Sequence, residues 1–370
     1  MSNDQETAQF DFSKISPARP EDLTPGMFLG KEKNYRLEKF LGAGGMGEVW
    51  LATEIEDGVE LRKVVCKIIP ALVQREKEAM EKVLKTFHLV QPLNHPNICP
   101  IYSLRADPVC GYFFVIAYAD GGTLWDWVQQ QPDYASGLSV SQVVEVLRPI
   151  AQALDYAHEM GVMHRDVKPQ NVLFVTRRGR KIPWLIDFGI SAQIHSTTTQ
   201  TLGDSGSSGT PAYMAPEQCQ SLMQDGRTDQ YSLGVIVYQL LSGRLPFAAD
   251  TPVELWKEIV YKPVPPLTNV SAQTNNAVQR ALAKERKDRF ASCVEFMDAL
   301  EGKESFSLSR WCAETLKKHK WLWLAALLVL LAMVLWILGA SEQRAETGGP
   351  TPPASYSIHD SNLQLKTINV

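Results

Sequence analysis

Two short stretches of the sequence carry acidic, amide and basic side chains that together could handle a phosphate. Residues 164–171 read HRDVKPQN, and residues 187–189 read DFG. Carboxylate and amide oxygens suit Mg²⁺, and an ammonium group neutralises phosphate charge. Phosphoryl transfer asks for this combination, because positioning and charge neutralisation supply most of its catalysis. Taken singly, each of these residues could equally be a surface acid or a helix-capping amide.

A glycine pattern lies earlier in the chain. Gly42, Gly44 and Gly47 form G-x-G-x-x-G, a pattern that dinucleotide-binding folds and kinase folds share. A dinucleotide fold needs a helix directly after the glycines, whereas residues 48–53 read EVWLAT and continue as a strand. The glycines therefore lie at a turn between two strands, where backbone amides can approach phosphates. Lys67 ends the next apolar run, and by itself it could be a solvated strand lysine.

A third stretch, residues 209–217, reads GTPAYMAPE and follows the other two in the order typical of protein kinases. On these motifs the chain resembles a Ser/Thr protein kinase, and most of all the bacterial eukaryotic-like (Hanks-type) kinases. Many of those are anchored by a single span after the catalytic domain. The resemblance covers residues 35–300. It implies an α+β, two-lobed fold that binds ATP and Mg²⁺ and acts on Ser or Thr hydroxyls of protein substrates.

The resemblance also implies a role for each residue of the motifs. Asp166 would accept the proton of the substrate hydroxyl, and Lys168 would neutralise the γ-phosphate. Asn171 and Asp187 would hold Mg²⁺, and Lys67 would hold the α- and β-phosphates. The linker at 116–119 would meet adenine. The implied ATP-binding residues are Leu41, Gly42, Gly44, Gly47, Val49, Lys67, Ile116 and Tyr118.

Further residues resemble structural and regulatory parts of the family. Glu217 is placed to pair with Arg289, and Asp229 to accept hydrogen bonds from the catalytic-loop backbone. Thr210 would contact Asp166 and Lys168. Arg165, beside Asp166, needs an anion, because a buried unpaired cation is costly. A phosphate on Thr197, Thr198, Thr199 or Thr201 would supply it, so we expect activation by autophosphorylation.

One position departs from the family pattern. Kinases carry a glutamate on the helix after Lys67, and counting back from His95 places it at 86, where this chain has Thr86. The nearest acid is Glu81, which could serve only if the helix contains a compensating insertion. The ion pair of Lys67 is therefore in question, and with it the efficiency of transfer.

The hydrophobic pattern changes along the chain from strands to helices. Strands are expected at 36–41, 48–54 and 61–69, with Asp57-Gly58 as a hairpin turn. Helices are expected around 143–157, at 231–241 and within 277–300. A small β lobe at about 35–116 and a larger helical lobe at about 120–300 follow from this order. Residues 1–34 are expected to form a flexible arm, and the six cysteines to be reduced and mostly buried.

Residues 321–341 contain no charge and are long enough, as a helix, to cross a bilayer. Lysines crowd the preceding segment 301–320, so the positive-inside rule places the N-terminal side in the cytoplasm. The tail 342–370 is expected to be short, disordered and non-cytoplasmic. The sequence thus predicts a single-pass protein of the cell membrane that contacts the lipid bilayer through one helix.

Composition limits the choice of partners. The net charge is −4, from 37 basic and 41 acidic residues, and gives no footprint for nucleic acid. Three functions stay open: an active protein kinase, a nucleotide-binding scaffold that transfers phosphate weakly, and a kinase acting on a small molecule. The segment 215–217 and Thr210 disfavour the third, because they build a platform for protein substrates. A homodimer is possible.

Overall fold

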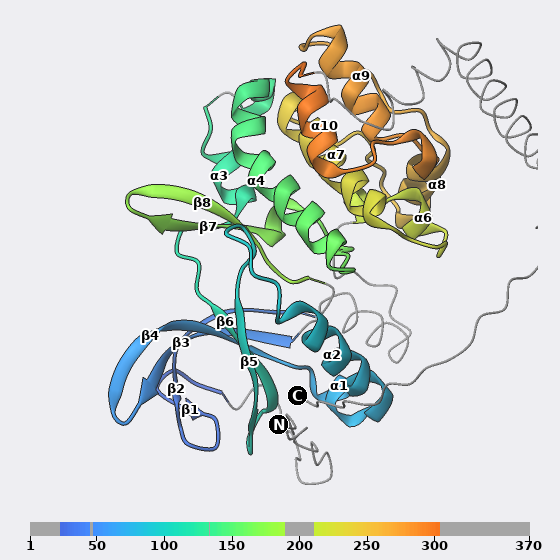
Figure 1. Ribbon diagram of the computed structural model, residues 1–370. Coiled ribbons are helices and arrows are strands. Elements are labelled where there is room, and N and C mark those ends of the chain that lie inside the picture. Colours follow the sequence, from blue (N-terminus) through green and yellow to red (C-terminus); the bar gives the residue numbers. More distant parts are fainter. Residues whose placement is uncertain (1–22, 45–46, 133, 189–210, 304–370) are drawn as a thin grey trace, which may run out of the picture. The chain divides into compact units, whose positions relative to one another are not determined.

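The computed structural model describes residues 23–44, 47–132, 134–188 and 211–303. Its first part is a six-stranded antiparallel sheet with the strand order β1-β2-β3-β4-β6-β5, and its later part consists mainly of helices (Figure 1). The α+β arrangement of two lobes is thus confirmed. The strands of the sheet are β1 (Phe28–Leu29), β2 (Tyr35–Gly44), β3 (Gly47–Glu56), β4 (Val59–Ile68), β5 (Ile101–Asp107) and β6 (Gly111–Ala117).

The predicted hairpin turn joins β3 to β4. Asp57 and Gly58 both have positive φ, +49° and +77°, as a tight two-residue hairpin requires. Alternating residues of the strands turn toward the two faces of the sheet. One face buries Leu37, Trp50, Ala52, Val64 and Cys66 in a single cluster.

The other face of the sheet carries two helices, α1 (Ala71–Arg75) and α2 (Lys77–Val90). Most of the residues of α2 that are buried recur at helical spacing and join Tyr112 and Phe114 of β6 in a second cluster. They are Ala79, Met80, Val83 and Phe87, whereas the last buried residue of α2, Val90, packs in the core of the helical lobe. These contacts fix α2 over the sheet.

The predicted flexible arm at 1–34 needs a correction at its end. Within the described residues, 28–29 form β1 and pair with β2, and Leu23 and Leu29 are buried in the same cluster as Leu37. The apolar side chains of this segment complete the edge of the sheet. The small lobe therefore begins before residue 35.

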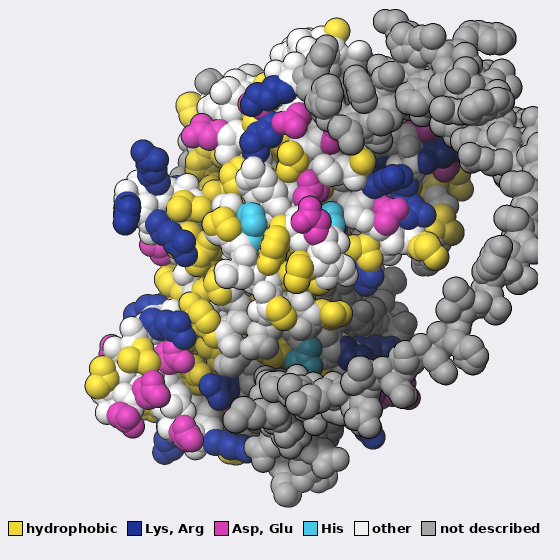
Figure 2. All heavy atoms as spheres, viewed as in Figure 1, with side chains coloured by type: hydrophobic (Ala, Val, Ile, Leu, Met, Phe, Trp, Pro, Cys, Tyr) yellow, Lys and Arg dark blue, Asp and Glu magenta, His cyan; other side chains and the backbone are white. Residues whose placement is uncertain are grey.

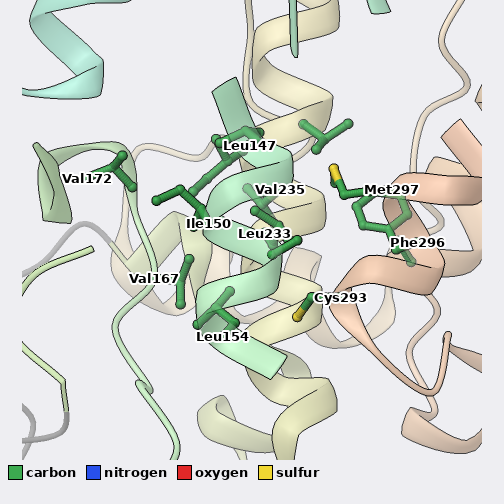
Figure 3. Close-up of a cluster of buried hydrophobic side chains, with 14 of the residues drawn as sticks. Leu147, Ile150, Leu154, Val167, Val172, Leu233, Val235, Cys293, Phe296 and Met297 are labelled. Carbon is green, nitrogen blue, oxygen red and sulfur yellow. The ribbon is translucent and has the colours of Figure 1, made fainter. Parts of the chain in front are cut away.

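The helical lobe is built around α7, whose residues from Thr228 to Leu241 are all buried. Because α7 is covered on every side, it shows little of the polar and apolar alternation of a surface helix. Its neighbours include α4 and α10, whose apolar side chains meet those of α7 in Figure 3. The helices are α3 (Leu124–Gln129), α4 (Val140–Glu159), α6 (Pro216–Cys219), α7 (Gly226–Ser242), α8 (Pro252–Tyr261), α9 (Ala272–Ala281) and α10 (Cys293–Leu300).

Several predicted helices extend further than their apolar pattern. The helix expected around 143–157 is α4, which begins after the capping residue Ser139 and contains Pro149. The helix expected at 231–241 is α7, and the stretch 277–300 holds the end of α9 and all of α10. Capping residues and polar first turns extend these helices, because such residues satisfy the free backbone N–H groups.

A separate two-stranded sheet, β7 (Val172–Arg177) and β8 (Arg180–Leu185), lies in the helical lobe between the two sequence motifs. Its turn exposes Arg177, Arg178, Arg180 and Lys181, and basic side chains gather over this hairpin in Figure 2. Its other end is buried at Val172 and Leu185. Because Val172 pairs with Leu185, the hairpin brings the segment of Asp187 close to Asn171.

The described residues contain no helix that is both long enough and apolar enough to cross a membrane. The predicted span at 321–341, the predicted basic segment 301–320 from residue 304 onward, and the tail 342–370 lie outside the described residues. Thr210 and the threonines between 197 and 201 also lie outside them. The five described cysteines are all free and buried, as predicted.

Candidate active site

Three side chains of the first motif converge after α4. The Nζ atom of Lys168 donates to both carboxylate oxygens of Asp166, at 3.0 and 2.8 Å. The amide nitrogen of Asn171 donates to the backbone oxygen of Asp166 at 2.7 Å and to its carboxylate at 2.9 Å. Asn171 is buried and Lys168 is nearly so, which fixes the carboxylate of Asp166 between them.

The helix α7 holds the backbone of residues 164 and 165 through the side chain of Asp229. Asp229 accepts hydrogen bonds from the backbone N–H of His164 at 2.8 Å and of Arg165 at 2.7 Å, as predicted. Arg165 has a φ of +66°, a conformation that costs a residue with a side chain about 1 to 2 kcal/mol. The two hydrogen bonds help to hold that conformation. A nitrogen of the His164 ring lies 2.7 Å from the backbone oxygen of Ile186, which ties the loop to the second motif.

Lys67 and Asp187 join the two lobes. The Nζ atom of Lys67, on β4, lies 2.8 Å from each carboxylate oxygen of Asp187. The side chain of Lys67 is only 6% exposed, whereas that of Asp187 is 18% exposed. Asp187 also has a positive φ, +67°, directly after the strand that ends at Leu185. The ammonium group thus neutralises the partly buried carboxylate.

The glycine pattern forms the predicted turn between strands. Gly44 ends β2, Gly47 begins β3, and the two residues pair, so the pattern closes a hairpin and does not start a helix. Gly47 has a φ of +96°, and a Cβ atom there would lie 1.8 Å from the backbone oxygen of Ile68. Only glycine fits this position. Val49 on β3 is directly opposite Lys67 on β4, so the hairpin and the lysine share one register.

The remaining predicted nucleotide residues lie on strands of the sheet or directly after one. Leu41 is on β2 and 44% exposed, next to Gly42. Ile116 is on β6 opposite Val65, and Tyr118 follows the strand directly. The backbone N–H of Ala117 is bonded to the oxygen of Pro100. The structure thus places the glycine hairpin, Lys67 and the linker on strands β2, β3, β4 and β6 of one sheet.

Thr86 lies in the register that the sequence predicted for it. The helix α2 runs without interruption from Lys77 to Val90, so it contains no insertion that would bring Glu81 into the place of residue 86. Glu81 is exposed, and Thr86 is partly buried. The carboxylate of Asp187 supplies a counter-charge to Lys67 from the other lobe.

Glu217 and Arg289 form the predicted ion pair. Their side chains are 4% and 0% exposed, and two guanidinium nitrogens lie 2.8 Å from the two carboxylate oxygens. The Thr228 hydroxyl also donates to Glu217 at 2.8 Å. The pair anchors α6, which follows residues 211–215.

The sequence reading missed two residues that touch the catalytic loop. A ring nitrogen of His158, on α4, lies 2.8 Å from the Asp229 carboxylate, and the Gln218 side chain donates to the backbone oxygen of Arg165. His158 directly follows the predicted helix and lies within α4, and the polarity of this residue at the end of α4 was the available signal. Gln218 carried no such signal, because its role depends on the fold of α6.

The donor set fits Mg²⁺ and a triphosphate. Asn171 uses its amide nitrogen on Asp166, which leaves its Oδ1 atom as an acceptor, and Asp187 adds two carboxylate oxygens. Hard oxygen donors of this kind are what Mg²⁺ prefers. Lys67 and Lys168 lie beside these acids and match the negative charge of phosphates.

Comparison with known proteins defines the class. The model of the protein kinase domain matches residues 35–322. The chain therefore belongs to the protein kinase family, and its matched part is an ATP-dependent protein kinase domain of the serine/threonine class.

Individual relatives agree with this assignment. The chain is 36% identical over 274 residues to the serine/threonine-protein kinase Pkn1 of Myxococcus xanthus, covering 72% of this chain and 38% of Pkn1. It is 32% identical over 268 residues to PknB of Mycobacterium tuberculosis, covering 70% and 41%. The crystal structure of the M. tuberculosis PknI kinase domain superimposes with a TM-score of 0.56 at 27% identity, covering 76% of this chain and 99% of that one. The chain matches about two fifths of the length of its curated relatives.

Proposed function

We propose that this protein transfers the γ-phosphate of ATP to Ser or Thr hydroxyls of protein substrates. The observation that carries the proposal is the convergence of Lys168 and Asn171 on Asp166, together with the contact of Lys67 and Asp187 between the lobes. A scaffold protein would have no need of two ammonium groups held beside two carboxylates. Phosphoryl transfer needs this arrangement.

In the proposed mechanism Asp166 accepts the proton of the substrate hydroxyl. Lys168 and Asn171 orient its carboxylate, and Lys168 neutralises charge on the transferred group. Lys67 holds the α- and β-phosphates. Asn171 and Asp187 hold Mg²⁺, which when bound neutralises charge on the phosphate oxygens.

The same proposal assigns the nucleotide site. Backbone N–H groups of the hairpin closed by Gly44 and Gly47 approach the phosphates, with Gly42, Leu41 and Val49 beside them. The linker from Ile116 to Tyr118 receives adenine. The missing side chain of Gly47 supports the proposal, because no other residue fits that turn.

We further propose that the protein is anchored in the cell membrane by residues 321–341, with its kinase domain in the cytoplasm, and that it is activated by autophosphorylation between 197 and 201. The uncharged stretch and its lysine flank support the anchor. Arg165 is exposed, and so is not the buried cation that the sequence predicted. It still supports the switch, because its guanidinium lies next to Asp166 in the chain and can pair with a phosphate. Tethering would raise local concentration and favour phosphorylation between two copies.

A second candidate is a nucleotide-binding scaffold with weak or no transfer. Thr86 favours it, because the helix α2 offers no carboxylate at the position where kinases orient the lysine. The contact of Lys67 with Asp187 weighs against it, because the lysine is already held at the site.

The test is phosphate transfer by the full chain in detergent, with labelled ATP, Mg²⁺ and a generic protein acceptor. Asp166→Asn keeps the shape of the side chain but removes the base, and we expect it to lose transfer. The exposed Asp250→Asn is the matched control and should keep it. Nucleotide binding without transfer by the wild type would support the scaffold instead. Phosphopeptide mapping of active protein tests the switch, which fails if Thr197, Thr198, Thr199 and Thr201 are all unmodified.

A further inference from the structure

The carboxylate of Asp229 is a buried anion that organises the catalytic loop. Its side chain is 1% exposed, and it accepts the backbone N–H groups of His164 and Arg165. Arg165 is held there with a φ of +66°. A buried carboxylate is stable only when it is hydrogen-bonded and its charge is compensated. The source of that compensation therefore affects the geometry of Asp166, one residue further along.

His158 on α4 is positioned to supply it. A nitrogen of its ring, Nε2, lies 2.8 Å from Oδ2 of Asp229, the same oxygen that His164 reaches. The side chain of His158 is 17% exposed. Among the described residues, no other basic side chain lies within ion-pair distance of Asp229. His158 is therefore the counter-ion available to this carboxylate.

The groups that surround His158 are mostly acidic. From its own helix, Asp155 faces the other ring nitrogen at 4.0 Å. From the start of α7, Asp225 adds a second negative charge, although it is also paired with Arg286 at 2.9 Å. From α10, the buried thiol of Cys293 lies beside Asp155, which accepts the backbone N–H of Cys293 at 2.8 Å.

Packing fixes the ring in this place. A Cβ atom at Gly226 would lie 2.6 Å from Nδ1 of His158, so the backbone of α7 rests directly against the imidazole. Burial by itself would lower the pKa of His158. The hydrogen bond to Asp229 and the charge of that carboxylate, with smaller effects of Asp155 and Asp225, raise the pKa above its usual value overall.

We propose that His158 is a positioning residue for phosphoryl transfer, whose protonated form holds Asp229 and, through it, the backbone of residues 164–166. The inference rests on the proposed function, because it concerns the loop that carries Asp166. His158 does not touch the reacting groups, so its effect should be on turnover and not on nucleotide binding.

The pH dependence follows from the direction of the shift. A histidine whose folded pKa exceeds its unfolded value of about 6.5 contributes fully below that value. The contribution is lost as pH rises through the folded pKa. A neutral imidazole can still donate one hydrogen bond to Asp229, but it no longer compensates the charge. The loop should therefore be held best in the lower part of the physiological range.

The experiment compares kcat and the KM for ATP of the full chain and of His158→Gln from about pH 6 to about pH 9, around the ordinary pKa of histidine. Glutamine can donate the same hydrogen bond but carries no charge. We expect the ratio of wild-type to variant kcat to be about tenfold near pH 6, as for a charge-assisted hydrogen bond, and to fall toward one at high pH. The KM for ATP should differ less than about twofold.

A matched control is His88→Gln, at an exposed position of α2, which should leave the ratio at one throughout. A ratio for His158→Gln that is one, or that does not change with pH, would overturn the inference. An NMR titration of the His158 ring in the wild type gives a readout that needs no variant, and a pKa at or below the ordinary value would also overturn it. A wild type without any transfer would refute the proposed function, and the NMR result would then show whether the charge pairing itself exists.

Discussion

Two ion pairs of equal length show two different uses of buried charge. Arg289–Glu217 and Lys67–Asp187 both measure 2.8 Å. Arg289 also donates to three backbone oxygens, and Glu217 receives the Thr228 hydroxyl, so protein groups saturate that pair. It lies wholly within the large lobe, between α6 and the segment before α10.

The pair of Lys67 and Asp187 is arranged differently. It connects a strand of the small lobe to the segment after β8, and the side chain of Asp187 is 18% exposed where that of Glu217 is 4% exposed. Both of its members are groups that can also bind phosphate or Mg²⁺. The comparison indicates that the first pair supports stability and the second supports function.

The largest expected effect is on stability, at Arg289. Arg289→Met leaves Glu217 buried without its counter-charge, which should lower the free energy of unfolding by about 3 to 5 kcal/mol. Urea unfolding measures this loss. Arg286→Met is the matched control, because its pair with Asp225 is far more exposed and should contribute less than about 1 kcal/mol. If the two variants lost the same free energy of unfolding, the buried pair of Arg289 would contribute no more to stability than the more exposed pair of Arg286.

Lys67→Met should affect the rate of phosphate transfer more than the stability of the fold. Loss of this charge should lower the rate of transfer by about 10²- to 10³-fold, while the free energy of unfolding changes less than for Arg289→Met. Steady-state kinetics and urea unfolding of the same sample check both parts. Lys63→Met, at an exposed position of the same strand, should leave the rate unchanged. If Lys67→Met lost stability but kept its rate of transfer, the pair of Lys67 and Asp187 would support stability and not function.

The sequence predicted the contact within one of these ion pairs and, for the other, only that its two residues share a site. The resemblance to protein kinases implied that Asp166, Lys168, Asn171, Lys67 and Asp187 belong to one site. The structure brings Lys168 and Asn171 to Asp166 and joins Lys67 to Asp187. Their roles in transfer stay predictions. The pairing of Glu217 with Arg289 was also predicted from the family resemblance and is confirmed.

Other features depend on tertiary contacts that no local pattern records. The strand at 28–29 was assigned to a flexible arm, because two residues are too short for a periodic signal, and only pairing with β2 defines it. His158 was passed over because its partner is 71 residues away on α7. Strand and helix ends differed by a few residues, since caps and turns extend each element beyond its apolar pattern.

A smaller effect is expected at Thr86. If Lys67 is only partly oriented by Asp187, then Thr86→Glu should raise kcat/KM for ATP about two- to fivefold, the size of a partly exposed ion pair. Leu89→Glu, at a 60% exposed position of the same helix, adds the same charge and should have no effect. A decrease for Thr86→Glu would mean that the second ion pair already positions the lysine fully.

The last prediction concerns the pH dependence of stability and a partly buried cation, Lys284, whose ammonium donates to the backbone oxygen of Ile259 at 2.5 Å. Burial, with the positive charge of Arg289, lowers the pKa of Lys284 to about 8. Between that value and about 10.5 the unfolded chain binds the extra proton, so the free energy of unfolding should rise with pH. Lys284→Met should remove this rise in urea unfolding, and the exposed Lys287→Met should keep it. If the free energy of unfolding had the same pH dependence in both variants, Lys284 would not be the group responsible for the rise.

The most direct test of the account is calorimetric titration of the full chain with ATP in the presence and absence of Mg²⁺. We predict binding that strengthens with Mg²⁺ and that loses this Mg²⁺ dependence in Asp187→Asn. A wild-type chain that releases no heat with Mg²⁺ and ATP would contradict the claim that these residues form a nucleotide site.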